Sequence, residues 1–378
     1  MRYMQFYKRH LAGNVRGGGT TPENNASQLH ISVAMATYNG EKYIEEQLLS
    51  ICRQTRRPNE IVISDDGSRD ATLEVVARVA ASEDAQGIDF VVITDNPRHG
   101  YCGNFEWAIK HTTGDLIFLS DQDDVWLPEK VAEIVRVFEM NSDAECVCHN
   151  ATLIGKNGNT IEGVFDERFL TGKLNVPEGS VVKIDRETYL EPSVSWGGIH
   201  GMSMCCTRAF FKDILPFPQS RGFHDKWITV SAIMKDAMYY LNLPLTLYRL
   251  HANNTCGSSA YRGNIGERIK RSLNRLLGGR GCYDAYYRMG SAIKIRLEEC
   301  GYSNHIAYGT AKRLVEIGEK TYDAETSGRI MGAVKICKLF CTDMRYRRCG
   351  TGAFLQELVY ILRYSKSSRL QNAGEIIK

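Results

Sequence analysis

The stretch GDLIFLSDQDDVW, residues 114 to 126, crowds carboxylates directly after an apolar run that is typical of a buried strand. Asp121, Asp123 and Asp124 repel one another, and burying them costs several kcal/mol unless a cation compensates. Clusters rich in oxygen and free of sulfur suit Mg²⁺ or Mn²⁺, which usually also hold substrate phosphates. The stretch therefore indicates a site for a metal and a diphosphate. The alternative is a solvated acidic loop in which Asp124 caps the next helix.

A second acidic segment, Asp65-Asp66-Gly67-Ser68, follows an earlier apolar strand. Asp and Gly favour turns, so this segment could form only a tight turn. Its carboxylates could equally accept hydrogen bonds from a nucleobase N–H or a ribose hydroxyl. The first strand is followed neither by G-x-x-x-x-G-K-[ST] nor by G-x-G-x-x-G, which counts against a P-loop NTPase and a Rossmann dehydrogenase.

The elements that must position these groups alternate between strand and helix. The patterns predict strands within 31–40, 60–68, 88–97, 115–124 and 144–154, and helices within 41–55, 69–82, 104–112 and 129–141. Such alternation predicts a parallel sheet covered on both faces, which binds ligands at the carboxyl ends of its strands. Thr37-Tyr38-Asn39 and the two acidic segments would then share one rim.

The rest of the chain has a different character. Residues 155 to 255 are less regular, and from about Ser258 the sequence becomes helical and basic, with GNIGERIKRSLNRLLGG and then Arg345, Arg347 and Arg348. These basic helices could lie on an anionic membrane surface. They could instead pack on the preceding domain with their charges in water.

Composition limits the class of protein. The net charge of +3, from 47 basic and 44 acidic residues, does not call for a nucleic acid partner. The 12 cysteines show no disulfide framework, which indicates a reducing compartment, and Cys146-x-Cys148-His149 lacks the second pair of a zinc finger. No apolar run reaches the roughly 18 to 20 residues that span a bilayer, and the first 30 residues lack the apolar core of a signal peptide. We expect a cytoplasmic protein, either soluble or peripheral on the inner face of the membrane.

Four segments together resemble one family. VAMATYNG, IVISDDGSRDAT, GDLIFLSDQDDVWLPEK and HDKW look like family 2 glycosyltransferases with the GT-A fold, and SDQDDVW with YRLHANN resembles the bacterial rhamnosyltransferase-like subgroup. The resemblance implies a mainly parallel nucleotide-binding sheet flanked by helices. It also implies three parts, namely a flexible leader (1–30), a GT-A domain (31–257) and a C-terminal helical basic extension (258–378).

The resemblance also implies the reaction. The family transfers a sugar, with inversion, from a nucleotide sugar to an acceptor hydroxyl. For this subgroup we expect transfer of L-rhamnose from dTDP-L-rhamnose to a hydroxyl of a growing bacterial surface polysaccharide, with a glycan or a lipid-linked glycan as the acceptor. A UDP-hexose or UDP-galactofuranose donor is the alternative. A divalent ion, Mg²⁺ or Mn²⁺, would offset the charge of the leaving diphosphate.

Residue roles follow from the same resemblance. The nucleotide would be contacted by Thr37, Tyr38 and Asn39, and its base held by Asp66, with Asp65 beside it. Asp121 would face the ribose or the sugar, Asp123 would ligate the metal, and Asp124 could share either task.

The later motifs complete the predicted site. Asp225, in GFHDKWI, would be the general base on the acceptor hydroxyl, unless it only pairs with Lys226 or caps a helix. His224 is a rival base at a position where many relatives carry an acid.

His251 resembles the histidine that reaches the metal or diphosphate in some relatives, with a structural role as the alternative. Arg249 could pair with phosphate or form a surface salt bridge. Trp126, near the donor, and Trp196, near the acceptor, could stack on a sugar or pack in the core.

Two other classes compete. A nucleotidyltransferase also uses an α/β sheet and paired aspartates, but usually opens with a glycine-rich phosphate loop, whereas ATYNGEKY has one glycine. A glycan-binding scaffold on a degenerate transferase fold would have lost the D-x-D motif or the base. Both motifs are present here.

Overall fold

The computed structural model describes residues 29–97, 99–161, 176–196, 199–218, 224–251, 287–326, 331 and 334–338. Residues 1–28 of the predicted leader lie outside the described residues, as do the segment GNIGERIKRSLNRLLGG, the cluster Arg345, Arg347 and Arg348, and the side chain of Trp196.

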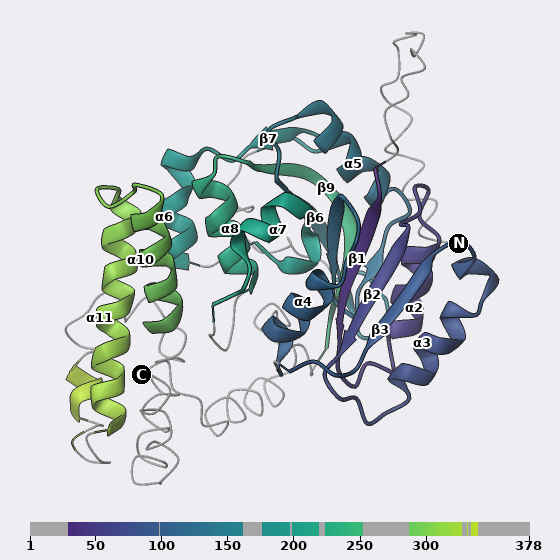
Figure 1. The fold of residues 1–378 in the computed structure, drawn as a ribbon, viewed down its shortest axis with the longest axis horizontal. Coiled ribbons are helices and arrows are strands. Elements are labelled where there is room, and N and C mark those ends of the chain that lie inside the picture. The colour runs from purple at the N-terminus through teal and green to yellow at the C-terminus, as the bar shows by residue number, and fades with distance from the viewer. Residues whose placement is uncertain are drawn as a thin grey trace.

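The first half of the chain forms the predicted strand–helix alternation (Figure 1). Its strands are β1 (Ile31–Thr37), β2 (Glu60–Asp65), β3 (Asp89–Ile93) and β4 (Leu116–Ser120). Its helices are α2 (Ile44–Cys52), α3 (Thr72–Ala80) and α4 (Tyr101–Lys110). A short 3₁₀ turn, η2 (Glu83–Ala85), precedes β3. The strands pair in parallel in the order β3-β2-β1-β4. The predicted parallel sheet is therefore confirmed for this half of the molecule.

The second half turns the sheet into a mixed one. After β5 (Val125–Trp126) and α5 (Lys130–Met140), the predicted fifth strand is β6 (Cys146–Gly155). It does not pair with β4, because β8 (Met204–Thr207) lies between them and is antiparallel to both. β9 (Met238–Leu250) pairs with β6 in parallel and with β5 and β7 (Val181–Lys183) antiparallel. The segment 155–255, which looked irregular in sequence, thus supplies three strands of the sheet.

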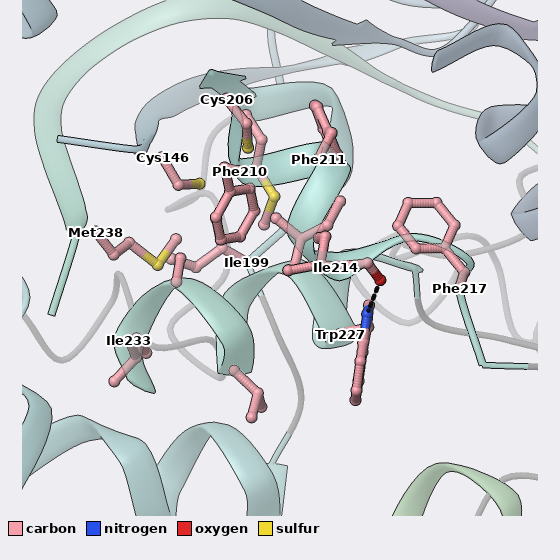
Figure 2. Close-up of a cluster of buried hydrophobic side chains, with 14 of the residues drawn as sticks. Cys146, Ile199, Cys206, Phe210, Phe211, Ile214, Phe217, Trp227, Ile233 and Met238 are labelled. Carbon is pink, nitrogen blue, oxygen red and sulfur yellow. Dashed lines mark hydrogen bonds between the residues drawn. The ribbon is translucent and has the colours of Figure 1, made fainter. Parts of the chain in front are cut away.

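The core lies on both faces of the sheet, as expected from alternating side chains. Along β4, Ile117 and Leu119 join one cluster while Leu116 and Phe118 join the other. The first cluster is covered by α4, α6 (Arg186–Trp196), α7 (Arg208–Ile214) and α8 (His224–Met234). Figure 2 shows its aromatic part, where Trp227 Nε1 donates to the carbonyl of Ile214 at 2.9 Å.

Two helices of the C-terminal region pack against this same cluster. α10 (Met289–Glu299) and α11 (Ile306–Thr326) lie beside α6 and α8 (Figure 1). Met289, Ile293 and Leu297 of α10, with Ala307 and Ala311 of α11, belong to the same buried cluster as Trp227. These two helices therefore share the core of the preceding domain. In the part of the chain that the structure describes, no helix combines the length and apolarity needed to cross a bilayer.

Candidate functional site

The polar segments that end β1, β2 and β4 meet at one rim, as the sequence predicted. The register places Thr37 opposite Asp65 and Met35 opposite Ser120, so the loops after these strands are neighbours. Thr37 Oγ1 donates to Asp65 Oδ2 at 2.9 Å. The three loops therefore form one connected surface.

A side-chain amide joins the first loop to the acidic loop. Gln122 Oε1 accepts from the Tyr38 N–H at 2.9 Å, and its Nε2 donates to the Tyr38 carbonyl at 3.0 Å. A Cβ at Gly40 would lie 2.3 Å from Gln122 Oε1, so this pairing needs glycine there. Neither Gln122 nor Gly40 was among the predicted site residues. The phenol of Tyr38 is left 53% exposed at the rim.

Asn39 fastens the same loop to the loop after β2. Its backbone has a φ of 47°, in the left-handed region that Asn tolerates. Its N–H donates to Ser68 Oγ and its Oδ1 accepts from the Arg69 N–H, both at 2.8 Å. In this structure Asn39 therefore shapes the rim rather than projecting its amide from it.

The two neighbouring aspartates after β2 have different roles. Asp65 is buried and accepts from Thr37, from the Gly67 N–H and from both the N–H and the hydroxyl of Ser68, so it takes the turn-forming role that the sequence allowed. Asp66 instead faces the loop before α4. Its Oδ1 lies 2.7 Å from His99 Nδ1, and its Oδ2 accepts from the Gly100 N–H at 2.8 Å.

His99 was not predicted. Its side chain is 80% exposed, so a ligand could displace it from Asp66 without disturbing the core. No sequence signal beyond its place in the loop after β3 would have identified it.

Asp124 is the buried acid of the loop. Its Oδ1 accepts from the Arg249 N–H at 2.9 Å, while its Oδ2 is buried without a hydrogen-bond partner among the described residues. Burial, with the charges of Asp123 and Asp121, raises its pKa well above the usual value. The helix-capping alternative for Asp124 is wrong, because α5 starts after Glu129 and no side chain caps it.

The pKa of Asp121 is raised by burial and in part by the predicted general base, Asp225. Burial, followed by the charges of Asp123 and Asp225, raises the pKa of Asp121 to about 7, while Lys130 opposes the shift. The charge of Asp225, at the start of α8, thus acts on a carboxylate of the acidic loop, although α8 is far from that loop in sequence.

Asp123 meets the two predicted residues at the end of β9. Its Oδ2 lies 2.7 Å from His251 Nε2, and its carbonyl accepts from Arg249 Nε at 2.7 Å. Arg249 Nη2 also forms an ion pair with Glu46 Oε2 at 2.6 Å. The salt-bridge alternative for Arg249 is thus present in the structure, although the Arg249 side chain is buried and only its partner Glu46 lies at the surface. Arg249 holds the acidic loop, and its contact with phosphate stays a prediction.

Lys130, the first residue of α5, was not among the residues predicted from the sequence. It is fully buried, and its Nζ donates to the Met202 carbonyl at 2.8 Å and to Thr246 Oγ1 at 3.0 Å. The same Nζ lies 3.9 Å from the ring centroid of Trp126. Burial lowers the pKa of Lys130 to about 7.

Trp126 is itself buried against Phe118, which matches the core-packing alternative and leaves little of its surface for a sugar.

His224 and Asp225 are the first two residues of α8, and they differ in burial. Asp225 is only partly buried, and its Oδ1 accepts from the Lys226 N–H at 2.7 Å, while Lys226 Nζ donates to the Val194 carbonyl. His224 is stacked on Phe105 with ring centroids 4.4 Å apart, and burial lowers its pKa. Both of its ring nitrogens are buried without hydrogen-bond partners in the described part of the chain. The carboxylate is thus better placed than the imidazole to reach an acceptor.

The side chains at the rim include the kinds of donor atom that a hard divalent cation binds. Asp123 and His251 form a carboxylate–imidazole pair, and the unpartnered Asp124 Oδ2 lies in the same loop. Carboxylate oxygen and imidazole nitrogen are ligands that Mn²⁺ accepts, and Mg²⁺ favours the carboxylate. The described residues contain no set of three or more His, Cys, Asp or Glu side chains already arranged around one point.

Comparison with known proteins gives this geometry a context. Residues 32–211 match the model of Glycosyl transferase family 2. The chain is similar to an uncharacterized glycosyltransferase of Nostoc, alr2836, with 34% identity over 35% of this chain and 40% of that protein. It is also similar to the dTDP-rhamnosyl transferase RfbG of Shigella flexneri, with 29% identity over 60% of this chain and 74% of the relative. The match thus spans less than half of the Nostoc protein and about three quarters of the Shigella protein.

Solved structures are more distant. S. aureus TarS 1–349 in complex with UDP-GlcNAc has a TM-score of 0.49 and 16% identity, covering 91% of this chain and 92% of that one. The mannosyltransferase PcManGT from Pyrobaculum calidifontis, in complex with GDP-Man and Mn²⁺, has a TM-score of 0.45 and 19% identity, covering 97% of this chain and 95% of that one.

Proposed function

We propose that this chain, whose residues 32–211 belong to glycosyl transferase family 2 and form a glycosyltransferase domain of the GT-A type, is an inverting, metal-dependent sugar transferase. One observation carries the proposal. The acidic loop and the end of β9 come from distant parts of the sequence, yet Asp123 Oδ2 lies 2.7 Å from His251 Nε2, so a carboxylate–imidazole pair stands at the rim. The charge of the proposed base, Asp225, also acts on Asp121 of the same loop. A donor site and a base beside it are what an inverting transfer requires.

The proposed donor is dTDP-L-rhamnose and the proposed acceptor is a hydroxyl of a growing bacterial surface polysaccharide. The similarity to the dTDP-rhamnosyl transferase of Shigella flexneri supports the donor. A UDP-hexose or UDP-galactofuranose is the alternative donor for the same site. A lipid-linked acceptor and a membrane contact through the basic C-terminal region belong to this proposal, and the segments with the clustered arginines lie outside the described residues.

Donor binding would use the rim as follows. Asp66 would accept a hydrogen bond from the base of the nucleotide after His99 moves away, and the exposed ring of Tyr38 would contact the nucleotide. Thr37 and Asn39 would support the loop, since their side chains already bond to Asp65 and Arg69. Asp121 would face the ribose or the sugar.

Asp123 and His251 would hold the metal. A bound Mg²⁺ or Mn²⁺ supplies positive charge that offsets the charge of the leaving diphosphate. Arg249 fixes the main chain of Asp123, and the buried Asp124 fixes the main chain of Arg249, so the ligands sit on a braced loop.

Asp225 would act on the acceptor. As the acceptor oxygen attacks the anomeric carbon, the bond to the diphosphate breaks on the opposite face, and Asp225 takes the hydroxyl proton. Its partly exposed carboxylate at the start of α8 can meet a hydroxyl that arrives from solvent, whereas His224 is enclosed by aromatic rings.

A thermal-melting experiment tests the nucleotide site. The full chain would be melted with dTDP, UDP or GDP and with the corresponding nucleoside triphosphates, each with Mn²⁺ and each with a chelator. Stabilisation by dTDP that requires Mn²⁺ is expected. No stabilisation by any nucleoside diphosphate would contradict the proposal and favour a glycan-binding scaffold. Stabilisation by nucleoside triphosphates alone would favour a nucleotidyltransferase.

A further inference from the structure

We propose that Tyr43 is a positioning residue, whose aromatic face holds His251 in the orientation that binds the metal. The inference rests on the proposed function, in which His251 is a metal ligand. Tyr43 lies one residue before α2 and was not among the residues that the sequence analysis selected.

The contact itself is a stack between two rings. The ring centroids of Tyr43 and His251 are 4.9 Å apart, with an angle of 28° between the planes. Tyr43 is only 9% exposed, so its ring is held by its surroundings. With the imidazole plane set by this stack, Nε2 lies 2.7 Å from Asp123 Oδ2. Outer residues that orient metal-binding histidines commonly determine metal affinity.

The same ring supports the second residue that reaches the acidic loop from β9. Arg249 Cζ lies 4.7 Å from the Tyr43 centroid. This guanidinium donates to the Asp123 carbonyl and pairs with Glu46, which lies in the first turn of α2. Tyr43 and Glu46 thus connect α2 to the end of β9 and, through it, to the acidic loop.

The face of the ring matters in this arrangement, and the hydroxyl does not. Tyr43 Oη is buried and has no hydrogen-bond partner among the described residues. A buried hydroxyl without a partner gives no stability and can cost some. Tyr43→Phe is therefore a matched control that keeps the stacking face, whereas Tyr43→Leu removes it.

The test measures Mn²⁺ affinity by the EPR signal of free Mn²⁺, in the presence of saturating dTDP or UDP. We expect Tyr43→Phe to bind Mn²⁺ within about twofold of the parent protein, and Tyr43→Leu to bind it about 10- to 100-fold more weakly. Tyr43→Met, which is apolar and flexible, repeats the test if Tyr43→Leu does not fold. Melting temperatures identify the folded variants.

A double-mutant cycle separates positioning from a general structural role. If Tyr43 acts through His251, the double variant Tyr43→Leu/His251→Ala should bind Mn²⁺ no more weakly than His251→Ala alone. Parent-like affinity in Tyr43→Leu, or losses that add fully in the cycle, would overturn this inference and leave the proposed function intact. A parent protein that binds no Mn²⁺ with either nucleotide would overturn both.

Discussion

His251 Nε2 lies 2.7 Å from Asp123 Oδ2, although 128 residues separate the two in sequence. The pairing of β5 with β9 explains the contact. Val125 lies opposite Leu247, and because the strands are antiparallel, the residues just before β5 meet those at the end of β9. The short strand that follows the acidic loop therefore brings the predicted metal ligands together.

Replacing the proposed base separates binding from chemistry. Asp225→Asn should bind dTDP with Mn²⁺ as the parent does, because the carboxylate is not part of the donor rim. Its turnover should fall by roughly 10²- to 10⁴-fold, the usual contribution of a general base. Calorimetric titration and steady-state rates measure the two quantities. Turnover close to that of the parent would refute the assignment, and His224 would then be the residue to replace.

Gly40 is predicted to protect the amide pair between Gln122 and Tyr38. A methyl group at Gly40 would push the Gln122 amide aside, so Gly40→Ala should lose up to two hydrogen bonds, each worth about 0.5–1.5 kcal/mol, and should bind nucleotide more weakly. Chemical unfolding gives the stability. In a Gln122→Ala background the same Gly40→Ala change should cost little more, and an equal cost in both backgrounds would show that the pair is not the reason for the glycine.

Much of the fold and part of this site could be predicted from local sequence. The strands up to β4 were readable because apolar runs end in turn residues such as Asn39 and Gly67, and a parallel register then brings the strand ends together. β8 could not be recognised in the sequence, because a strand of four residues is too short to show a clear periodicity. Its place is set by its antiparallel pairing with β4 and β6. Lys130 was missed for a related reason, since its Nζ is buried against Met202 and Thr246, which are far from it in sequence.

Burial of His224 predicts a pH dependence of stability. Its pKa is lowered in the folded protein, so below about pH 6.5 the unfolded chain binds a proton that the folded protein does not. The free energy of unfolding should therefore fall as the pH drops from 6.5 to 5, by at most about 1.4 kcal/mol per pH unit for this group.

His224→Phe keeps an aromatic ring against Phe105 and should reduce that slope. The buried His149, whose pKa is also lowered by burial, contributes its own slope equally to both proteins. Urea unfolding at several pH values measures the difference. Identical slopes in the two proteins would show that burial does not lower the pKa of the His224 imidazole.

The C-terminal helices are predicted to stabilise the transferase domain directly. Ile293 on α10 is fully buried in the shared core, so Ile293→Ala should lower the stability of the whole unit by about 2–5 kcal/mol in a single unfolding transition. Ile295, on the same helix, is 52% exposed, and Ile295→Ala should change stability by less than about 0.5 kcal/mol. A separate early transition in Ile293→Ala, with the main one unchanged, would instead support an independent extension beginning near residue 258.

A donor screen tests the proposed sugar transfer most directly. The protein would be incubated with a membrane extract that supplies acceptors and with dTDP-rhamnose, UDP-glucose, UDP-galactose, UDP-galactofuranose or UDP-GlcNAc, and released nucleoside diphosphate would be counted. We predict Mn²⁺- or Mg²⁺-dependent release from dTDP-rhamnose that is abolished by a chelator and by Asp123→Asn. Release that neither the chelator nor Asp123→Asn affects, or no release from any donor, would contradict the account.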